Sequence, residues 1–157
     1  MTQRRTRFTM RAAAVLGLFG LPAALLTAPA AQATTSQCAY TWIPGAVYGE
    51  VTDVTLISQG RTLKLWNDKG ADLYSYAEIT SGYQSGDQVW IDRSYNHMPL
   101  GDRHPSNLQV DMNGGWFQCG PFSRRYSGVV NSWHYAVRAC MRPVNGISHC
   151  GRWNVDQ

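Results

Sequence analysis

Residues 135–155 read YAVRACMRPVNGISHCGRWNV, and this stretch predicts a β-hairpin closed by a disulfide bond. Val144, Asn145 and Gly146 fit a three-residue hairpin loop, because asparagine and glycine tolerate the left-handed backbone that such a loop requires. The loop sets Cys140 opposite Cys150 on the paired strands, within the distance at which a disulfide forms. The C-terminal part of the chain is therefore predicted to be antiparallel β-structure.

The register of this hairpin gives it one apolar face and one polar face. The apolar face holds the cross-strand pairs Val137–Trp153 and Tyr135–Val155. The polar face holds both cysteines, His134 opposite Asp156, and Arg138 opposite Arg152. Like charges that face each other across a strand pair repel. The two arginines are therefore either a clamp for a carboxylate, phosphate or sulfate group, or two solvated side chains that point apart, or one of them bonds to Asp156.

The chain has four cysteines, and their number and positions predict two disulfides. An even count in an exported chain favours a disulfide framework. Pairing Cys140 with Cys150 leaves Cys38 to pair with Cys119 and to tether the N-terminal end of the mature domain. No CxxC motif occurs, and the histidines are not spaced as zinc ligands around the cysteines, so no metal is predicted.

Upstream of the hairpin, stretches rich in β-branched and aromatic residues alternate with turn residues, which predicts further strands. The predicted strands span residues 47–57, 61–66, 71–80, 88–93, 108–112 and 116–119. The last two form a hairpin around Asn113-Gly114-Gly115, and residues 95–106 form a long surface loop. No window beyond the N-terminal segment has helical periodicity. The expected fold is an all-β antiparallel β-sandwich, with a barrel as the alternative.

The N-terminal segment 1–33 has the pattern of a cleaved signal peptide. Four arginines precede an apolar run over residues 12–26, and Ala31-Gln32-Ala33 offers the small residues at which a signal peptidase cuts. The run is too short, and too interrupted by glycine and proline, for a membrane span. We therefore expect residues 34–157 to form a single secreted, extracellular β domain with no membrane span.

Removal of the signal peptide changes the charge of the chain. The whole sequence has 14 Lys and Arg residues against 10 Asp and Glu residues. Four of the arginines lie in residues 1–33, so the mature domain keeps 10 basic and 10 acidic residues (14 minus 4 against 10) and no formal net charge. Nucleic-acid binders normally carry a basic surplus, so no nucleic-acid partner is expected.

Several short motifs carry a resemblance to a known kind of module: YAEI at 76–79, GDQVWIDRS at 86–94, VRAC at 137–140 and CGRW at 150–153. Together they resemble a small β module of exported actinobacterial proteins, found alone or appended to larger secreted proteins such as carbohydrate-active enzymes. The match covers residues 73–155. No activity is established for the module, so the resemblance implies a secreted β domain and no catalytic residue. The loop at 97–106 and the Cys38/Cys119 pair depart from it, so an added function would sit in that loop.

Common catalytic motifs are absent from the sequence, which has no nucleophile elbow, no HExxH, no P-loop and no Rossmann fingerprint. Acid–base candidates gather in and beside the long loop: Asp92, His97, Asp102, Arg103 and His104. A glycosidase would need two carboxylates across the scissile bond, which Asp92, Asp102 and Asp111 could supply. Solvated loops collect the same residue types without catalysis, so we expect no enzymatic activity and no cofactor.

Aromatic residues give the strongest sign of binding, because flat rings suit both sugar faces and protein interfaces. The chain has 6 Trp and 8 Tyr residues. Strand alternation predicts four of these rings in the core: Trp90, Trp133, Tyr135 and Trp153. Rings near turns are predicted to be exposed: Trp42, Tyr48, Tyr83, Tyr95, Trp116 and Tyr126.

These features predict an exported, non-catalytic module that binds an extracellular glycan or a cell-wall component. The predicted contact residues are Trp42, Tyr95, Trp116, Arg138 and Arg152. Two alternatives stay open. One is a protein–protein module, such as a secreted inhibitor that presents residues 95–106 to its partner. The other is a small hydrolase that depends on His97 or His104.

Overall fold

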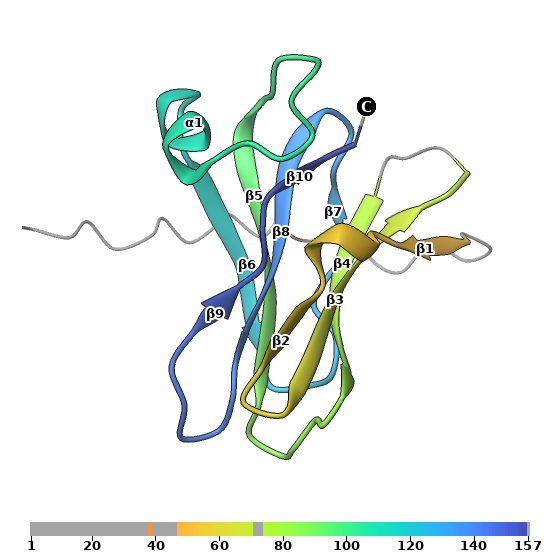
Figure 1. The fold of residues 1–157 in the computed structure, drawn as a ribbon, viewed down its shortest axis with the longest axis vertical. Helices are drawn as coiled ribbons and strands as arrows, with labels where there is room; N and C mark the ends of the chain where they lie inside the picture. The colour runs from red at the N-terminus through yellow and green to blue at the C-terminus, as the bar shows by residue number, and fades with distance from the viewer. Residues whose placement is uncertain (1–37, 39–46, 71–73, 157) are drawn as a thin grey trace, which may run out of the picture.

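The computed structural model describes residues 38, 47–70 and 74–156, which form two antiparallel five-stranded sheets packed as a sandwich (Figure 1). The first sheet contains β1 (Tyr48–Glu50), β2 (Leu56–Ser58), β3 (Arg61–Asp68), β4 (Tyr74–Ser81) and β7 (Val130–Asn131). The second contains β5 (Gln88–His97), β6 (Trp116–Phe122), β8 (Tyr135–Arg142), β9 (His149–Cys150) and β10 (Asn154–Val155). The predicted all-β antiparallel sandwich is confirmed, and the described strands do not close into the alternative barrel.

The core lies between the two sheets and follows from the alternation of apolar residues along the strands. Every second residue of the central strands points inward and is almost fully buried. These residues are Leu63, Leu65, Ala77, Ile79, Val89, Ile91, Val137, Ala139 and Met141, together with Phe117 and Cys119 of β6. Such a core stabilises the sandwich by removing apolar surface from water.

Both predicted disulfides are present. Cys140 and Cys150 lie directly opposite each other on β8 and β9, with their Cα atoms 4.1 Å apart. Cys38 is joined to Cys119 of β6 across a sequence separation of 81 residues. The predicted signal peptide and the contact residue Trp42 lie outside the described residues. No helix in the described ranges has both the length and the apolar character needed to cross a membrane.

The register of the C-terminal hairpin agrees with the prediction only as far as the disulfide. Cys140 pairs with Cys150, but further along β8 Val137 pairs with Asn154 instead of Trp153. One extra residue is accommodated after Cys150, as in a β-bulge, so every later side chain moves to the opposite face. The predicted Tyr135–Val155 and His134–Asp156 pairs are therefore wrong, and no strand pairing joins Arg138 to Arg152 in the described residues. Val155 pairs with Ala136, and a backbone bridge joins Asp156 to Trp133.

The bulge places Trp153 on the outer face of the second sheet, where it forms a second, smaller core. There it packs with Met98, Val110, Ala136 and Val155. Val110 belongs to α1 (Asn107–Met112), a short helix where the sequence predicted a strand at 108–112. The segment is helical because Ser106 and Gln109 form a capping box, each side chain bonding the backbone of the other residue. The predicted hairpin at 108–119 is therefore wrong.

Two other predicted segments have different bounds. The strand expected over 47–57 is broken by a 3-10 turn, η1 (Thr52–Val54), between β1 and β2. The loop expected to begin at residue 95 begins later, because β5 continues through His97. The remaining loop lies with α1 and the C-terminal end of β10 at one end of the sandwich (Figure 1). This end carries the functional candidates.

Candidate functional site

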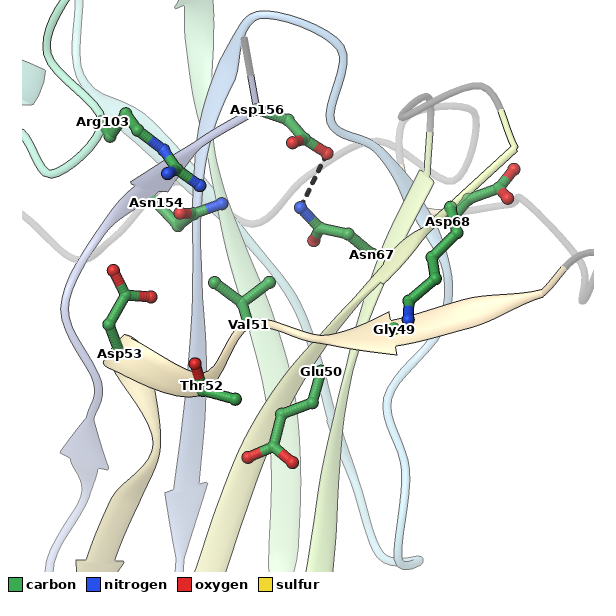
Figure 2. A pocket seen from close by; sticks show the side chains of 11 residues that line it. Gly49, Glu50, Val51, Thr52, Asp53, Asn67, Asp68, Arg103, Asn154 and Asp156 are labelled. Atoms are coloured by element: carbon green, nitrogen blue, oxygen red, sulfur yellow. Dashed lines mark hydrogen bonds between the residues drawn. The ribbon is translucent and has the colours of Figure 1, made fainter.

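A polar pocket of about 360 Å³ opens between η1, the end of β3 and β10 (Figure 2). Its lining is almost entirely polar: Glu50, Thr52, Asp53, Asn67, Asp68, Lys69, Arg103, Asn154 and Asp156, with Gly49 and Val51. Figure 2 shows Arg103 and Asn154 on one side of the pocket, and Asn67 and Asp156 on the other. We refer to this cavity as the polar pocket.

Four separate parts of the chain build the polar pocket. The loop before α1 contributes Arg103, whose carbonyl oxygen accepts a hydrogen bond from Val155 N–H at 2.9 Å. This bond fixes the loop beside β10. The β1–η1 segment is fixed in turn by the bond from Val51 N–H to the Leu65 carbonyl, also 2.9 Å. The pocket therefore rests on backbone bonds between distant segments.

Asn154 is the most unusual residue of the polar pocket. Its side chain is almost fully buried, with 1% of the residue exposed. Neither its Oδ1 nor its Nδ2 atom has a hydrogen-bond partner among the described residues. A buried polar group without a partner costs about 1–3 kcal/mol of folding free energy. Among the residues that line the polar pocket, Asn154 is the one whose buried side-chain polar atoms lack a hydrogen-bond partner in the described part of the chain.

Asn67 and Asp156 face Asn154 across the polar pocket, and their positions are fixed by a short hydrogen-bond chain. Asn67 Nδ2 donates to the Asp156 carboxylate at 2.7 Å. Asn67 Oδ1 accepts from the buried Ser75 hydroxyl, also at 2.7 Å. Because both ends of the Asn67 amide are engaged, its orientation is set, and it holds the Asp156 carboxylate in place.

The wall of the polar pocket near η1 contains an ion pair between Asp53 and His104. His104 Nε2 lies 2.7 Å from the Asp53 carboxylate, and its Nδ1 lies 3.0 Å from the Trp153 carbonyl oxygen. Both partners are acceptors, so the two bonds form together only when both ring nitrogens carry a proton. His104 therefore connects η1 with the segment before β10 through its two ring nitrogens.

The remaining carboxylates of the polar pocket already have partners in the protein. Glu50 accepts from Lys64 Nζ at 2.6 Å, and this hydrogen bond lowers the pKa of Glu50. In Figure 2 Glu50 points away from Asn154. Asp68 accepts from the Gly70 N–H at 2.9 Å. Asp53 and Asp156 are likewise engaged, with His104 and with Asn67, and the Asn154 amide and the Arg103 side chain complete the lining.

None of the four predicted contact residues that the structure describes lines the polar pocket. Trp116 is half-buried and packs edge-on against Trp153, with ring centroids 6.2 Å apart. Tyr95 is 38% exposed and lies against the core ring of Phe117. Arg138 and Arg152 line a different cavity on the outer face of the second sheet.

The aromatic residues are distributed differently from the prediction. Trp90 and Trp153 are buried as expected, but Trp133, predicted in the core, is 49% exposed. Its ring contacts those of His97 and His134, and His97 also contacts Tyr135. These four residues, 97 and 133–135, form an aromatic cluster near the polar pocket, since the Trp133 backbone bridges to Asp156. Of the predicted exposed rings, Tyr95 and Tyr126 are exposed, whereas Tyr48, Tyr83 and Trp116 are half-buried.

The acid–base candidates of the sequence do not gather around one cavity. Asp92 is buried under Arg138, and Asp102 accepts hydrogen bonds from the His104 N–H and the Gln109 side chain. His97 belongs to the aromatic cluster, whereas His104 braces the polar pocket. Asp92 also lies 3.3 Å from Cys140 Sγ, but a disulfide offers no thiolate to a metal.

Sequence reasoning identified Arg103 and His104 but missed Asp53, Asn67, Asn154 and Asp156 of the polar pocket. These residues lie singly at strand ends and turns, and no spacing connects them. The only signal was the alternation Asn154-Val155-Asp156, which places two polar side chains on one face of the last strand. The bulge after Cys150 decides which face that is, and the sequence register placed it wrongly.

No family model matches the chain, and no curated protein or solved structure shows significant similarity to it. The resemblance to an exported actinobacterial module therefore stays a prediction.

Proposed function

We propose that this protein is an exported, non-catalytic module that binds a hydroxyl-rich ligand, a glycan or other cell-envelope component, in the polar pocket. The observation that carries this proposal is the buried Asn154 amide, whose donor and acceptor have no partner among the described residues. A sugar hydroxyl donates one hydrogen bond and accepts others, so it satisfies both ends of such an amide.

The other groups of the polar pocket fit the same ligand class. Arg103 offers donors, Asp156 and Asp53 offer acceptors, and Asn67 holds Asp156 in a fixed orientation. Neighbouring hydroxyls of a saccharide present alternating donors and acceptors at short spacing. A prearranged set of both kinds binds them without the entropic cost of ordering the side chains.

The aromatic cluster supports a saccharide ligand over other polar ligands. The half-exposed ring of Trp133 lies next to His97 and His134, and its backbone bridges to Asp156 at the border of the polar pocket. An exposed indole offers a flat apolar face to the C–H face of a sugar ring. A sugar chain longer than one unit can use the pocket and the ring together.

Two disulfides favour an oxidising compartment, which agrees with the export that the N-terminal sequence predicts. The first test is retention of the mature domain, residues 34–157 produced with both disulfides, on insoluble polysaccharides and on purified cell wall. Failure of the folded domain to bind any of them would contradict the proposal.

Asn154→Leu separates a binding role of this residue from a structural one. Leucine has a similar volume and removes the unpartnered polar atoms, so we expect an unchanged or higher free energy of unfolding. We expect retention on the polysaccharide that binds the wild type to fall about tenfold or more, as for a lost pair of hydrogen bonds.

Gln118→Leu is the matched control, because Gln118 is a half-buried amide on β6, outside the polar pocket. This variant should bind as the wild type does. Undiminished binding by Asn154→Leu would show that the polar pocket is not the binding site.

One observation favours a protein–protein module as the second candidate. Leu100 is 73% exposed and Met112 is 79% exposed, and both line an apolar cavity of about 300 Å³ between the loop and α1. Exposed apolar side chains that lie together are typical of interaction surfaces. A one-to-one complex with a folded protein, weakened by Met112→Ser, together with no retention on polysaccharide, would favour this second function.

A further inference from the structure

A second cavity of about 520 Å³ lies on the outer face of the second sheet, beside α1. It shares a wall with the polar pocket, because Arg103 and Asn154 line the polar pocket while the adjacent His104 and Trp153 line this cavity. Its lining in the described residues contains two arginines and a histidine, and no aspartate or glutamate. We call it the arginine cavity.

Arg138 is held in the arginine cavity by contacts on several sides. Its Nε donates to Asp92 at 2.8 Å, and its Nη1 donates to Asn107 Oδ1 at 3.0 Å. Its guanidinium carbon lies 4.8 Å from the ring centroid of Trp116 and 4.3 Å from that of Trp153. The Arg138 side chain is 12% exposed. Nη2 has no hydrogen-bond partner within the described part of the chain, so a pre-oriented donor is left over.

Asn107 supplies a second oriented donor. Its Oδ1 accepts hydrogen bonds from both Arg138 Nη1 and Trp153 Nε1, at 3.0 and 2.8 Å. These two bonds fix which end of the amide faces the protein. The Nδ2 group, with two N–H donors, therefore points away from these partners and makes no hydrogen bond to the residues the structure describes.

Arg152 supplies the net charge. It is exposed, lines the same cavity, and makes neither an ion pair nor a hydrogen bond with the described residues. Arg138 is already compensated by Asp92, and the His104 ring lies 2.7 Å from the Asp53 carboxylate. One unpaired positive charge thus lies with donors from Arg138 and Asn107, and no carboxylate competes for them on the cavity surface.

We propose that the arginine cavity binds an oxyanion group, a carboxylate or a phosphate, through Arg152, Arg138 Nη2 and Asn107 Nδ2. Charged hydrogen bonds from a planar guanidinium suit the oxygen atoms of such groups. The site goes beyond the polar pocket and does not depend on it. If both sites work, the shared wall suits an acidic saccharide whose sugar and anionic group occupy adjacent cavities.

The experiment is a titration of the mature domain with inorganic phosphate and with glucuronate at constant ionic strength, followed by amide chemical shifts. Glucose serves as the neutral counterpart of glucuronate. We expect saturable shifts of the Arg152, Gly151 and Asn107 amides with at least one anion. The anion that binds more tightly, phosphate or glucuronate, shows whether the cavity prefers a phosphate or a carboxylate group.

Two variants test the assigned donors. Arg152→Gln should lower the affinity for the more tightly bound anion about 10- to 100-fold, as expected for the loss of a charged hydrogen bond. Asn107→Asp keeps the acceptor for Arg138 and Trp153 but places a carboxylate in the cavity, so it should abolish binding. Arg142→Gln, an exposed arginine on β8 outside the cavity, removes the same charge and should leave the affinity within about twofold.

Three results would overturn the proposal. The folded wild type could show no saturable shifts with either anion. Arg152→Gln and Arg142→Gln could weaken binding equally, which would indicate general charge attraction. Chloride at the same ionic strength could produce the same shifts. Glucose binding in the polar pocket is measured in the same titrations, so failure of the anion site is separable from failure of the glycan proposal.

Discussion

At the scale of single residues, Asp92 is the most strongly perturbed acid of the described chain. Burial raises the pKa of Asp92 to about 6, and the neighbouring Arg138 cation only partly offsets this rise. The carboxylate is held beneath Arg138 and the Cys140–Cys150 disulfide, and hydrogen bonding from the Arg138 and Trp90 side chains does not outweigh its burial. Its ionised form is therefore costly, and the cost depends on pH.

The pKa of Asp92 predicts that this residue lowers stability as the pH rises. Because the folded pKa of about 6 exceeds the unfolded value of 3.8, the folded state binds more protons between these values. The contribution of Asp92 to the free energy of unfolding is fully present below about pH 4, and it is lost as the pH rises through 6. It amounts to about 3 kcal/mol, at 1.36 kcal/mol for each pKa unit.

Urea unfolding of the wild type and of Asp92→Asn between pH 4 and 8 measures this contribution. The asparagine keeps an acceptor for Arg138 but does not titrate, so the difference in unfolding free energy should change by about 3 kcal/mol across this range. Glu50 and Asp87 have lowered pKa values, so their contributions to the unfolding free energy are lost as the pH falls. These contributions are the same in the wild type and in Asp92→Asn, so they cancel in the difference between the two proteins. A difference that stays constant with pH would contradict the prediction.

At the scale of elements, α1 shows how a short local signal can outweigh a pattern. The helix has only six residues, and its stability rests on the capping box of Ser106 and Gln109 and on the burial of Val110. Ser106→Ala removes the cap and should lower the free energy of unfolding by about 1 kcal/mol. Ser123→Ala, at an exposed turn position, should change it by less than about 0.5 kcal/mol. Equal effects in urea unfolding would show that the cap does not stabilise the fold.

The strands were largely predictable because they leave local signals in the sequence. These signals are alternating apolar and polar residues, turn residues and the positions of the cysteines. Residues 61–66 and 88–93 are strands as expected, and Cys140 pairs with Cys150. The bulge after Cys150 was not predictable, because no residue type requires it. After the bulge, Trp153 lies in one apolar cluster with Val110, which comes from a distant segment. The lining of the polar pocket likewise comes from four distant segments, so no local pattern in the sequence revealed it.

At the scale of the whole molecule, the two disulfides act over very different lengths of chain. Cys38–Cys119 spans 81 residues and ties Cys38, which packs against the main core, to β6. Cys140–Cys150 spans only 10 residues and cross-links the two strands of one hairpin, which are already paired through their backbones. A cross-link stabilises mainly by restricting the unfolded chain, and the restriction grows with loop length. The longer loop should therefore contribute more to stability.

This comparison predicts the order of two double variants. The loop-entropy relation gives about 4.5 kcal/mol for the 81-residue loop and about 2.7 kcal/mol for the 10-residue loop. Replacing Cys38 and Cys119 by alanine should thus lower the free energy of unfolding by about 2 kcal/mol more than replacing Cys140 and Cys150. Urea unfolding of both variants, with the wild type under oxidising conditions, measures the order. The reverse order would mean that the Cys140–Cys150 disulfide stabilises the folded outer face itself, because that disulfide covers Asp92 and borders the arginine cavity.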